Sequence, residues 1–175
     1  MGKNRKKVQV IVLLLAFLIG GYAIFQTFTD DNNGTIKEGH AVPDFRLANL
    51  QGEPVSLQDY EGTPLVINFW GTFCEPCIRE MPSFERQYAK WKEKGVEIVA
   101  INLSEDTLTV SNYVKKLGVT YTVLRDVDRK TEKRYGLRSY PTTFFVNSDG
   151  TLSSVFVGEM LEAQINEHIE DMIGG

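Results

Sequence analysis

The two cysteines are the residues of this chain whose type and spacing most directly suggest chemistry. Cys74 and Cys77 are its only cysteines, two residues separate them, and they lie where an apolar run gives way to a helical pattern. Unpaired N–H groups at a helix N-terminus stabilise a thiolate, so Cys74 is the expected attacking sulfur. Cys77, one turn further along, is the expected resolving sulfur, which attacks a mixed disulfide at Cys74. The spacing therefore predicts thiol-disulfide exchange.

A cysteine pair has two other common roles, and the sequence disfavours both. A structural disulfide across so short a loop restricts the unfolded chain by only about 2 kcal/mol, against about 4 kcal/mol or more for a long loop. A zinc site needs four ligands, and the only histidines, His40 and His168, lie far from the pair along the chain. We therefore expect no metal and no tightly bound cofactor.

The elements that must position the cysteines follow a β-α-β pattern. Residues 64–70 (PLVINFW) form a nearly continuous apolar run, which is typical of a strand buried on both faces. Residues 74–94 have the pattern of a helix that is kinked at Pro82 and ends at Gly95. A second buried strand is predicted over residues 96–103. Because a helix connects them, these two strands are expected to be parallel.

The rest of the chain predicts further strands and helices around this unit. They are an early β-hairpin (45–47 and 55–57), helices at 106–117, 128–135 and 161–173, and strands at 122–124, 142–146 and 151–157. The turn at residues 147–150 makes the last two strands antiparallel. Helices that cover a mixed sheet predict a three-layer α/β/α sandwich.

The start of the chain has the features of a membrane anchor. Residues 8–29 carry no charge and span about the 20 residues that cross a hydrocarbon core as a helix. Basic residues precede this run and acidic residues follow it, which orients the N-terminus toward the cytoplasm. No convincing cleavage site follows the run, so an uncleaved signal-anchor is favoured. The predicted organisation is a cytoplasmic tail (1–7), a transmembrane signal-anchor (8–29), a linker (30–39) and an extracytoplasmic domain (40–175).

The charge of the chain argues against a nucleic-acid partner. The formal net charge is -4, but four of the 19 basic residues precede Asp30, the first acidic one. The remainder has 15 basic residues against 23 acidic residues, hence a net charge of -8. Such an acidic domain repels phosphate backbones.

Two segments together resemble the thioredoxin superfamily. They are residues 68–77 (NFWGTFCEPC) and 140–144 (YPTTF), and the resemblance covers residues 37–173. The anchor, the early hairpin, the helical insert before the third strand and the run CEPCIREMP look most like the ResA branch of the wider TlpA-like family. That branch reduces the haem-binding cysteines of apocytochrome c outside the bacterial cell membrane. The resemblance thus implies a thioredoxin-like fold, this client, and a transmembrane thiol carrier of the CcdA type as electron donor.

The resemblance also assigns roles to individual residues. Pro141 matches the family's cis-proline, which presents backbone to an extended client, and Tyr140 and Phe73 lie beside it as docking residues. Glu80 matches a glutamate inside the active-site cavity, where a carboxylate raises thiol pKa values and relays protons. Glu105 aligns with a cavity-lining acid, although an exposed loop charge fits the sequence nearly as well.

Two positions depart from the wider superfamily. Asn68 stands where thioredoxin carries a buried acid, which places more weight on Glu80 as the proton carrier. From the residues alone, Glu80 reads instead as a charge that favours a helix N-terminus. Phe73 replaces the usual tryptophan before the first cysteine, and we expect only client affinity to change. Trp70 is expected to be a core residue.

Other functions remain as alternatives. A copper-delivery protein uses a longer cysteine spacing and a distal histidine. A peroxidase of the peroxiredoxin type needs a Pro-x-x-x-Thr-x-x-Cys pattern, and Ile67 and Gly71 occupy the proline and threonine places. The nearest alternatives keep the same chemistry: another extracytoplasmic client, such as a spore envelope protein, or an oxidant that forms disulfides. The reduction potential decides the direction, at about 30 mV for each tenfold change in equilibrium constant.

Overall fold

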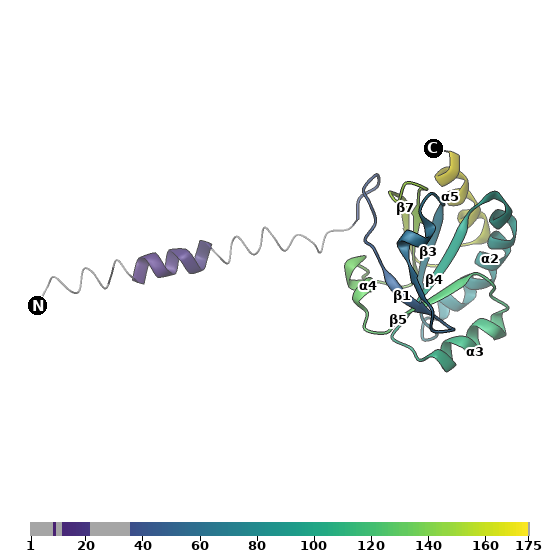
Figure 1. Ribbon diagram of the computed structural model, residues 1–175, viewed down its shortest axis with the longest axis horizontal. Coiled ribbons are helices and arrows are strands. Elements are labelled where there is room, and N and C mark those ends of the chain that lie inside the picture. The colour runs from purple at the N-terminus through teal and green to yellow at the C-terminus, as the bar shows by residue number, and fades with distance from the viewer. Residues whose placement is uncertain (1–8, 10–11, 22–35, 175) are drawn as a thin grey trace, which may run out of the picture. The chain divides into compact units, whose positions relative to one another are not determined.

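The computed structural model describes residues 9, 12–21 and 36–174. The chain divides into two units, Met1–Gly34 and Thr35–Gly175, and each is described here by itself (Figure 1). Among the described residues of the first unit, 12–21 are helical.

Only half of the predicted membrane anchor lies within the described residues. The predicted tail at 1–7, residues 8, 10–11 and 22–29 of the predicted anchor, and residues 30–35 of the predicted linker are not among them. In the ranges that are described, no helix combines the length and the apolar character needed to cross a membrane. The anchor therefore stays a prediction.

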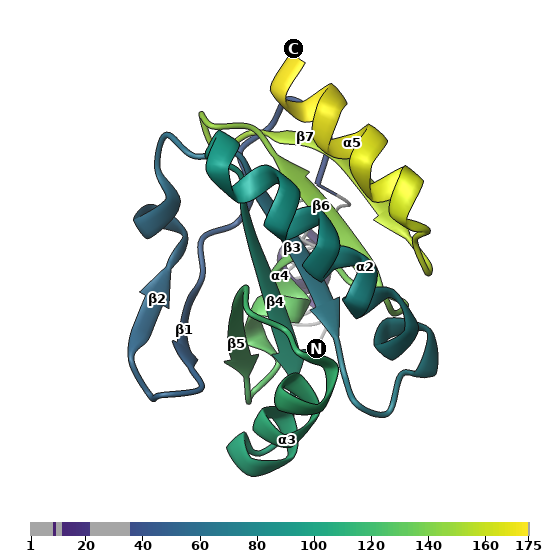
Figure 2. The same cartoon turned by 90° about the vertical axis from the view of Figure 1, so that its right-hand side faces the viewer.

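The second unit is built on one seven-stranded sheet (Figure 2). Its strands are β1 (Arg46–Asn49), β2 (Pro54–Ser56), β3 (Leu65–Trp70), β4 (Glu97–Leu103), β5 (Thr122–Asp126), β6 (Thr142–Val146) and β7 (Leu152–Val157). They lie in the order β2-β1-β5-β4-β3-β6-β7. β3, β4 and β5 are parallel neighbours, whereas β6 runs antiparallel to both β3 and β7. The predicted mixed sheet is confirmed.

Helices lie on both faces of this sheet. They are α2 (Glu75–Trp91), α3 (Thr107–Leu117), α4 (Lys130–Arg134) and α5 (Glu162–Gly174). Apolar residues of α2, α3 and α5 share one core cluster, and Figure 2 shows α2 and α5 side by side over the sheet. A second core cluster lies on the opposite face of the sheet. It includes Tyr135, which directly follows α4, and Val42 and Phe45 of the segment before β1. The layers are those predicted, but the third one consists of the short α4, the 3-10 helix η2 (Leu57–Tyr60) and irregular chain.

The central strand β3 directs alternate residues to opposite faces. All six residues are buried, as the apolar run predicts. Val66 and Trp70 belong to the cluster under α2, whereas Ile67 and Phe69 belong to the opposite cluster. Because side chains alternate with a period of two, Asn68 also faces α2. The strand thereby places a polar side chain beneath the helix that carries the cysteines.

The helix α2 begins and ends close to the predicted positions. Cys74 is its N-cap, and the helix continues through Pro82 to Trp91. A 3-10 turn, η3 (Lys92–Lys94), follows, and Gly95 closes it with a φ of 82°, a left-handed conformation that suits glycine. The predicted helix thus comprises an α-helix and one tighter turn.

The early hairpin is an integral part of the sheet rather than an appendage before it. β1 pairs antiparallel with β2 and, along its other edge, antiparallel with β5, where Ala48 lies opposite Arg125. The compact unit also begins before residue 40. Ile36 packs against the second core cluster, and the N–H of Gly39 donates to the carbonyl of Leu152 at 2.8 Å.

Candidate active site

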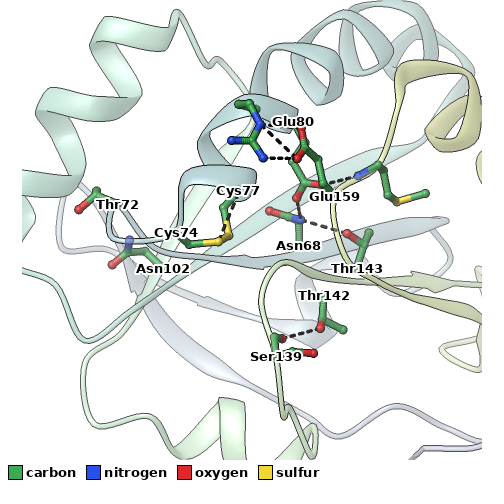
Figure 3. Close-up of a disulfide and its surroundings, with 12 residues drawn as sticks. Asn68, Thr72, Cys74, Cys77, Glu80, Asn102, Ser139, Thr142, Thr143 and Glu159 are labelled. Carbon is green, nitrogen blue, oxygen red and sulfur yellow. Dashed lines mark hydrogen bonds and ion pairs between the residues drawn. A yellow bond between two sulfur atoms is a disulfide. The ribbon is translucent and has the colours of Figure 1, made fainter.

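The two cysteines form a disulfide at the junction of β3 and α2 (Figure 3). Their Cα atoms are 5.3 Å apart, and the backbone N–H of Cys77 donates a hydrogen bond to Cys74 Sγ at 3.3 Å. Cys74 is 8% exposed, whereas Cys77 is 0% exposed. Because only Cys74 reaches the surface, and because its sulfur faces the N–H groups that begin α2, Cys74 is the sulfur placed for exchange with a partner.

Glu80 lies on α2 one turn after Cys77 and is only 1% exposed. Its carboxylate accepts hydrogen bonds from the Asn68 side-chain amide at 2.8 Å and from the Met160 backbone N–H at 2.9 Å. Burial raises the pKa of Glu80 to about 7, and the two hydrogen bonds only partly oppose this effect. An acid with this pKa takes up and releases protons near neutral pH, as thiol-disulfide exchange requires.

Asn68 connects three elements beneath the disulfide. Its amide nitrogen donates to Glu80 on α2 and, at 3.0 Å, to the Thr143 hydroxyl on β6 (Figure 3). Asn68 is 1% exposed and Thr143 is fully buried. Since an amide carries no charge, it holds the Glu80 carboxylate without the electrostatic stabilisation that a cation would give. Asn68 therefore orients Glu80 and leaves its proton exchangeable.

The loop before β6 has the backbone geometry that the resemblance predicts. The Tyr140–Pro141 peptide bond is cis. The Pro141 carbonyl accepts a hydrogen bond at 2.9 Å from the N–H of Gly158, which has a φ of 117°. Such a φ is accessible mainly to glycine, so Gly158 allows the end of β7 to hold this loop.

An aromatic pair joins the cis-proline loop to the cysteine loop. The rings of Phe73 and Tyr140 meet edge to face, with centroids 6.2 Å apart. The Phe73 ring also covers Gly71, where an added Cβ would lie 2.3 Å from the ring. Phe73 is 61% exposed, a large fraction for an apolar side chain. The two predicted docking residues thus form one accessible aromatic surface that touches both loops.

Glu105 holds the cysteine loop in place. Its carboxylate accepts hydrogen bonds from the backbone N–H of Thr72 at 2.7 Å, from the Thr72 hydroxyl, and from the Asn102 amide at 2.7 Å. The side chain is partly buried between these groups. Glu105 is therefore bound to the loop that leads to Cys74 and is not a free charge on an exposed loop.

An ion-pair network lies beside Glu80 on the surface. Arg79 contacts Glu159 at 2.6 Å and Glu75 at 3.0 Å. Hydrogen bonds from Arg79 hold the pKa of Glu159 below its usual range. Because Glu159 directly precedes Met160, this network fixes the segment whose N–H binds Glu80. Neither Glu159 nor Met160 was predicted as a site residue, since nothing in the sequence shows that they lie next to α2.

The described residues hold no group of three or more His, Cys, Asp or Glu side chains that could bind a metal ion. His168 stacks on Phe145, with ring centroids 4.7 Å apart, and hydrogen-bonds Ser154 at 2.9 Å. It therefore packs within the domain, against β6 and β7.

Known proteins are similar to the chain over nearly its whole length. The model of the AhpC/TSA family matches residues 39–155. The chain is 36% identical over 167 residues to the thiol-disulfide oxidoreductase ResA of Bacillus subtilis strain 168, a match that covers 95% of this chain and 93% of that protein. It is 35% identical over 170 residues to ResA of Bacillus anthracis, with 97% and 98% covered.

Solved structures agree with this relationship. A putative thiol:disulfide interchange protein DsbE from Chlorobium tepidum is 28% identical, with a TM-score of 0.75 over 80% of this chain and 100% of that chain. StoA from Bacillus subtilis is 27% identical, with a TM-score of 0.64 over 74% of this chain and 98% of that chain. These matches, together with the disulfide at the start of α2, show that the chain belongs to the AhpC/TSA family of thioredoxin-fold proteins and is a thiol-disulfide oxidoreductase of the ResA type.

Proposed function

We propose that this oxidoreductase works as a dithiol reductase outside the cytoplasm and that its client is the disulfide between the haem-binding cysteines of apocytochrome c. The observation that carries the exchange chemistry is the buried Glu80 behind the Cys74–Cys77 disulfide, with a pKa near neutral pH. The reductase direction follows from the resemblance to the ResA branch. The client follows from the ResA relatives and from the resemblance of the cysteine motif to that branch.

The first half of the reaction begins from the reduced protein. The Cys74 thiolate attacks one sulfur of the client disulfide, a new bond forms between Cys74 and the client, and the other client sulfur leaves as a thiolate. That thiolate takes up one proton from water. The N–H groups at the start of α2 stabilise the attacking sulfur, and in this proposal the client segment approaches over the aromatic surface of Phe73 and Tyr140.

The second half releases the client. Cys77 gives up its proton and attacks Cys74, so the mixed disulfide breaks, the second client thiolate leaves, and the Cys74–Cys77 disulfide forms. In this proposal the Glu80 carboxylate receives the proton from Cys77 and then passes it to the departing thiolate. The client thus gains two electrons and two protons, one proton from Cys77 by way of Glu80 and one from water, and the protein ends in the oxidised state that the structure describes.

We further propose that the domain lies outside a bacterial cell membrane. The uncharged run at residues 8–29, with basic residues before it and acidic residues after it, supports a single-pass anchor with the N-terminus in the cytoplasm. A domain on that side needs electrons from the membrane, and a transmembrane thiol carrier of the CcdA type is the proposed donor. If so, deleting the carrier leaves Cys74 and Cys77 oxidised in cells, and cysteines that stay reduced contradict this donor.

A trapping experiment tests the client. A full-length Cys77→Ser variant keeps the attacking sulfur but cannot resolve the mixed disulfide, so it should accumulate bound to its client in membranes. We expect peptides that contain the two haem-binding cysteines of apocytochrome c, linked through Cys74. A Cys74→Ser, Cys77→Ser double variant is the control. Trapping of a different extracytoplasmic protein, with no apocytochrome c, would replace the client and leave the exchange chemistry intact.

A further inference from the structure

A buried carboxylate on α4 connects to the cis-proline loop through a charged network. Glu132 is 7% exposed and accepts hydrogen bonds from Arg129 Nη2 at 2.7 Å, from Arg129 Nε, and from the Tyr140 hydroxyl. Arg129 Nη2 also donates to the Tyr140 hydroxyl at 2.7 Å. The hydroxyl of Tyr140 therefore donates to one charged group and accepts from the other, which fixes its position and its orientation.

The two charged residues are themselves anchored to the sheet. The backbone N–H of Glu132 donates to the buried side chain of Asp126 at 2.8 Å, and the backbone N–H of Arg129 donates to the Asp126 carbonyl at 3.2 Å. Asp126 is the last residue of β5. Arg129 adopts a φ of 57°, a left-handed conformation that non-glycine residues rarely take. The turn between β5 and α4 thus aims the guanidinium at Glu132 at some cost in backbone conformation.

Tyr140 connects this hydrogen-bond network to the residue that precedes Cys74. It directly precedes the cis Pro141, and its ring meets Phe73 edge to face. Phe73 directly precedes Cys74. The hydroxyl is therefore held by α4, while the ring of the same side chain forms half of the accessible aromatic surface beside the attacking sulfur. Among the described residues, neither Arg129, Glu132 nor Tyr140 forms a hydrogen bond to a cysteine sulfur. The contact that leads from them toward Cys74 is the aromatic pair of Tyr140 and Phe73.

We propose that Arg129 and Glu132 are positioning residues for client docking: they hold Tyr140 so that the Phe73–Tyr140 surface receives an apolar side chain next to a client cysteine. This inference rests on the proposed function only in requiring a polypeptide client. It assigns to α4, which lies on the face opposite α2, a part in selecting polypeptide disulfides over small ones.

The test compares two disulfides with the reduced full-length protein. One probe is a synthetic peptide with a Cys-x-x-Cys disulfide flanked by leucine, and the other is glutathione disulfide, which has no apolar side chain for the aromatic surface. The measured quantity is the ratio of the two second-order rate constants. The variants are Tyr140→Phe, which keeps the ring and removes the hydroxyl, and Arg129→Met, which removes the guanidinium. Arg134→Met, at an exposed arginine of the same helix, is the matched control.

We expect Tyr140→Phe and Arg129→Met to lower this ratio by about tenfold, the equivalent of one hydrogen bond to a charged group. The reduction potential should stay unchanged in both variants, and Arg134→Met should keep the wild-type ratio. Unfolding midpoints identify any variant that fails to fold, and Tyr140→Phe, the more conservative change, then decides. A ratio unchanged in Tyr140→Phe, or rates that fall equally with both probes, would overturn the proposal.

The same variants test the docking role of Arg129 and Glu132 even if the protein works as an oxidant rather than as a reductase. If the wild-type protein oxidises dithiols rather than reducing disulfides, the reductase function fails. The ratio can then be measured in the reverse direction, with the reduced peptide and glutathione as electron donors to the oxidised protein. A docking surface acts on both directions alike, because forward and reverse exchange pass through the same mixed disulfide.

Discussion

Two buried carboxylates lie on opposite faces of the sheet, and their surroundings differ in one respect. Glu80 is 1% exposed and binds only neutral donors, the Asn68 amide and the Met160 N–H. Glu132 is 7% exposed and binds the guanidinium of Arg129. The two carboxylates are buried to a similar depth, but the donors to Glu80 are neutral, whereas a donor to Glu132 is a cation.

The donor decides what each carboxylate can do. Without a cation in direct contact, burial favours the protonated acid, so the pKa of Glu80 rises to about 7 and its proton becomes exchangeable near neutral pH. With a guanidinium in contact, a buried carboxylate serves as a fixed acceptor, and Glu132 holds the Tyr140 hydroxyl in this way. One acid is suited to move protons, and the other is suited to hold a loop.

The largest expected effect is on stability. The pKa of Glu80 is about 7 in the folded protein against an ordinary 4.5, so the folded state binds its proton more tightly than the unfolded state does. Stability from this group is present below about pH 4.5 and is lost as the pH rises toward 7, in total about 3 kcal/mol. Urea unfolding at intervals from about pH 5 to pH 8 measures it.

Glu80→Gln is the control for this measurement, because glutamine does not titrate. The variant should show a nearly flat free energy of unfolding over the same range. The surface carboxylates whose pKa values are lowered, such as Asp106 and Glu159, lose their stabilising effect only as the pH falls below the ordinary range of an acid, so they do not interfere. A wild-type protein that gains stability from pH 5 to pH 8 would contradict the assignment.

The next effect is on the rate of exchange. Glu80→Gln should slow reduction of a peptide disulfide at neutral pH by about a hundredfold, the lower end of what a positioned acid or base contributes. The pH profile should also lose its inflection near pH 7. Stopped-flow kinetics with the full chain measure both. Glu93→Gln, at an exposed acid of η3 directly after the same helix, is the matched control and should change the rate little.

Arg129→Met removes the charged donor from Glu132, so that this buried carboxylate, like Glu80, has no cation in contact. The buried Glu132 loses its charged donor, so we expect a loss of about 2 kcal/mol in the free energy of unfolding. Glu132→Gln should cost only about 1 kcal/mol, because the Arg129 side chain is 44% exposed and is resolvated by water. Urea unfolding at about pH 7 measures both losses. A loss in Arg129→Met no larger than that in Glu132→Gln would show that the guanidinium does not set the difference between the two acids.

The smallest effect is expected at Gly71. An added Cβ lies 2.3 Å from the Phe73 ring, which is exposed and can move aside. Gly71→Ala should therefore leave stability nearly unchanged and reduce the rate with a peptide disulfide by about threefold, the equivalent of one aromatic contact. Gly174→Ala, where a Cβ meets nothing within 4 Å, is the control. A large loss of stability would mean that Phe73 is held more firmly than its exposure indicates.

Local patterns predicted the elements that carry the cysteines. The apolar run that became β3, the strand β6 at residues 142–146, and the glycine that closes the helix after the cysteines are all found where the sequence placed them. Periodicity and turn residues determine such elements, because each depends on neighbours along the chain. The cis bond before Pro141 followed from the resemblance and is confirmed.

The contacts of the site were harder to predict, because their partners are distant in sequence. Glu80 meets the N–H of Met160, and Glu105 meets Thr72, only after the sheet has assembled. Pairing of β1 with β5 likewise depends on the whole sheet, since a short hairpin does not specify its other neighbour. Arg129 and Glu132 are three residues apart at the start of a helix, a common local ion pair, and nothing in that spacing points to Tyr140.

The reduction potential of the Cys74–Cys77 couple tests the central claim most directly. The purified full chain is equilibrated in defined thiol buffers, with Cys74→Ser as the control that abolishes the couple. For a dithiol reductase we predict a potential near or below the roughly -270 mV of thioredoxin. A potential near the roughly -120 mV of a strong disulfide donor would reverse the direction of the reaction and contradict the proposed function.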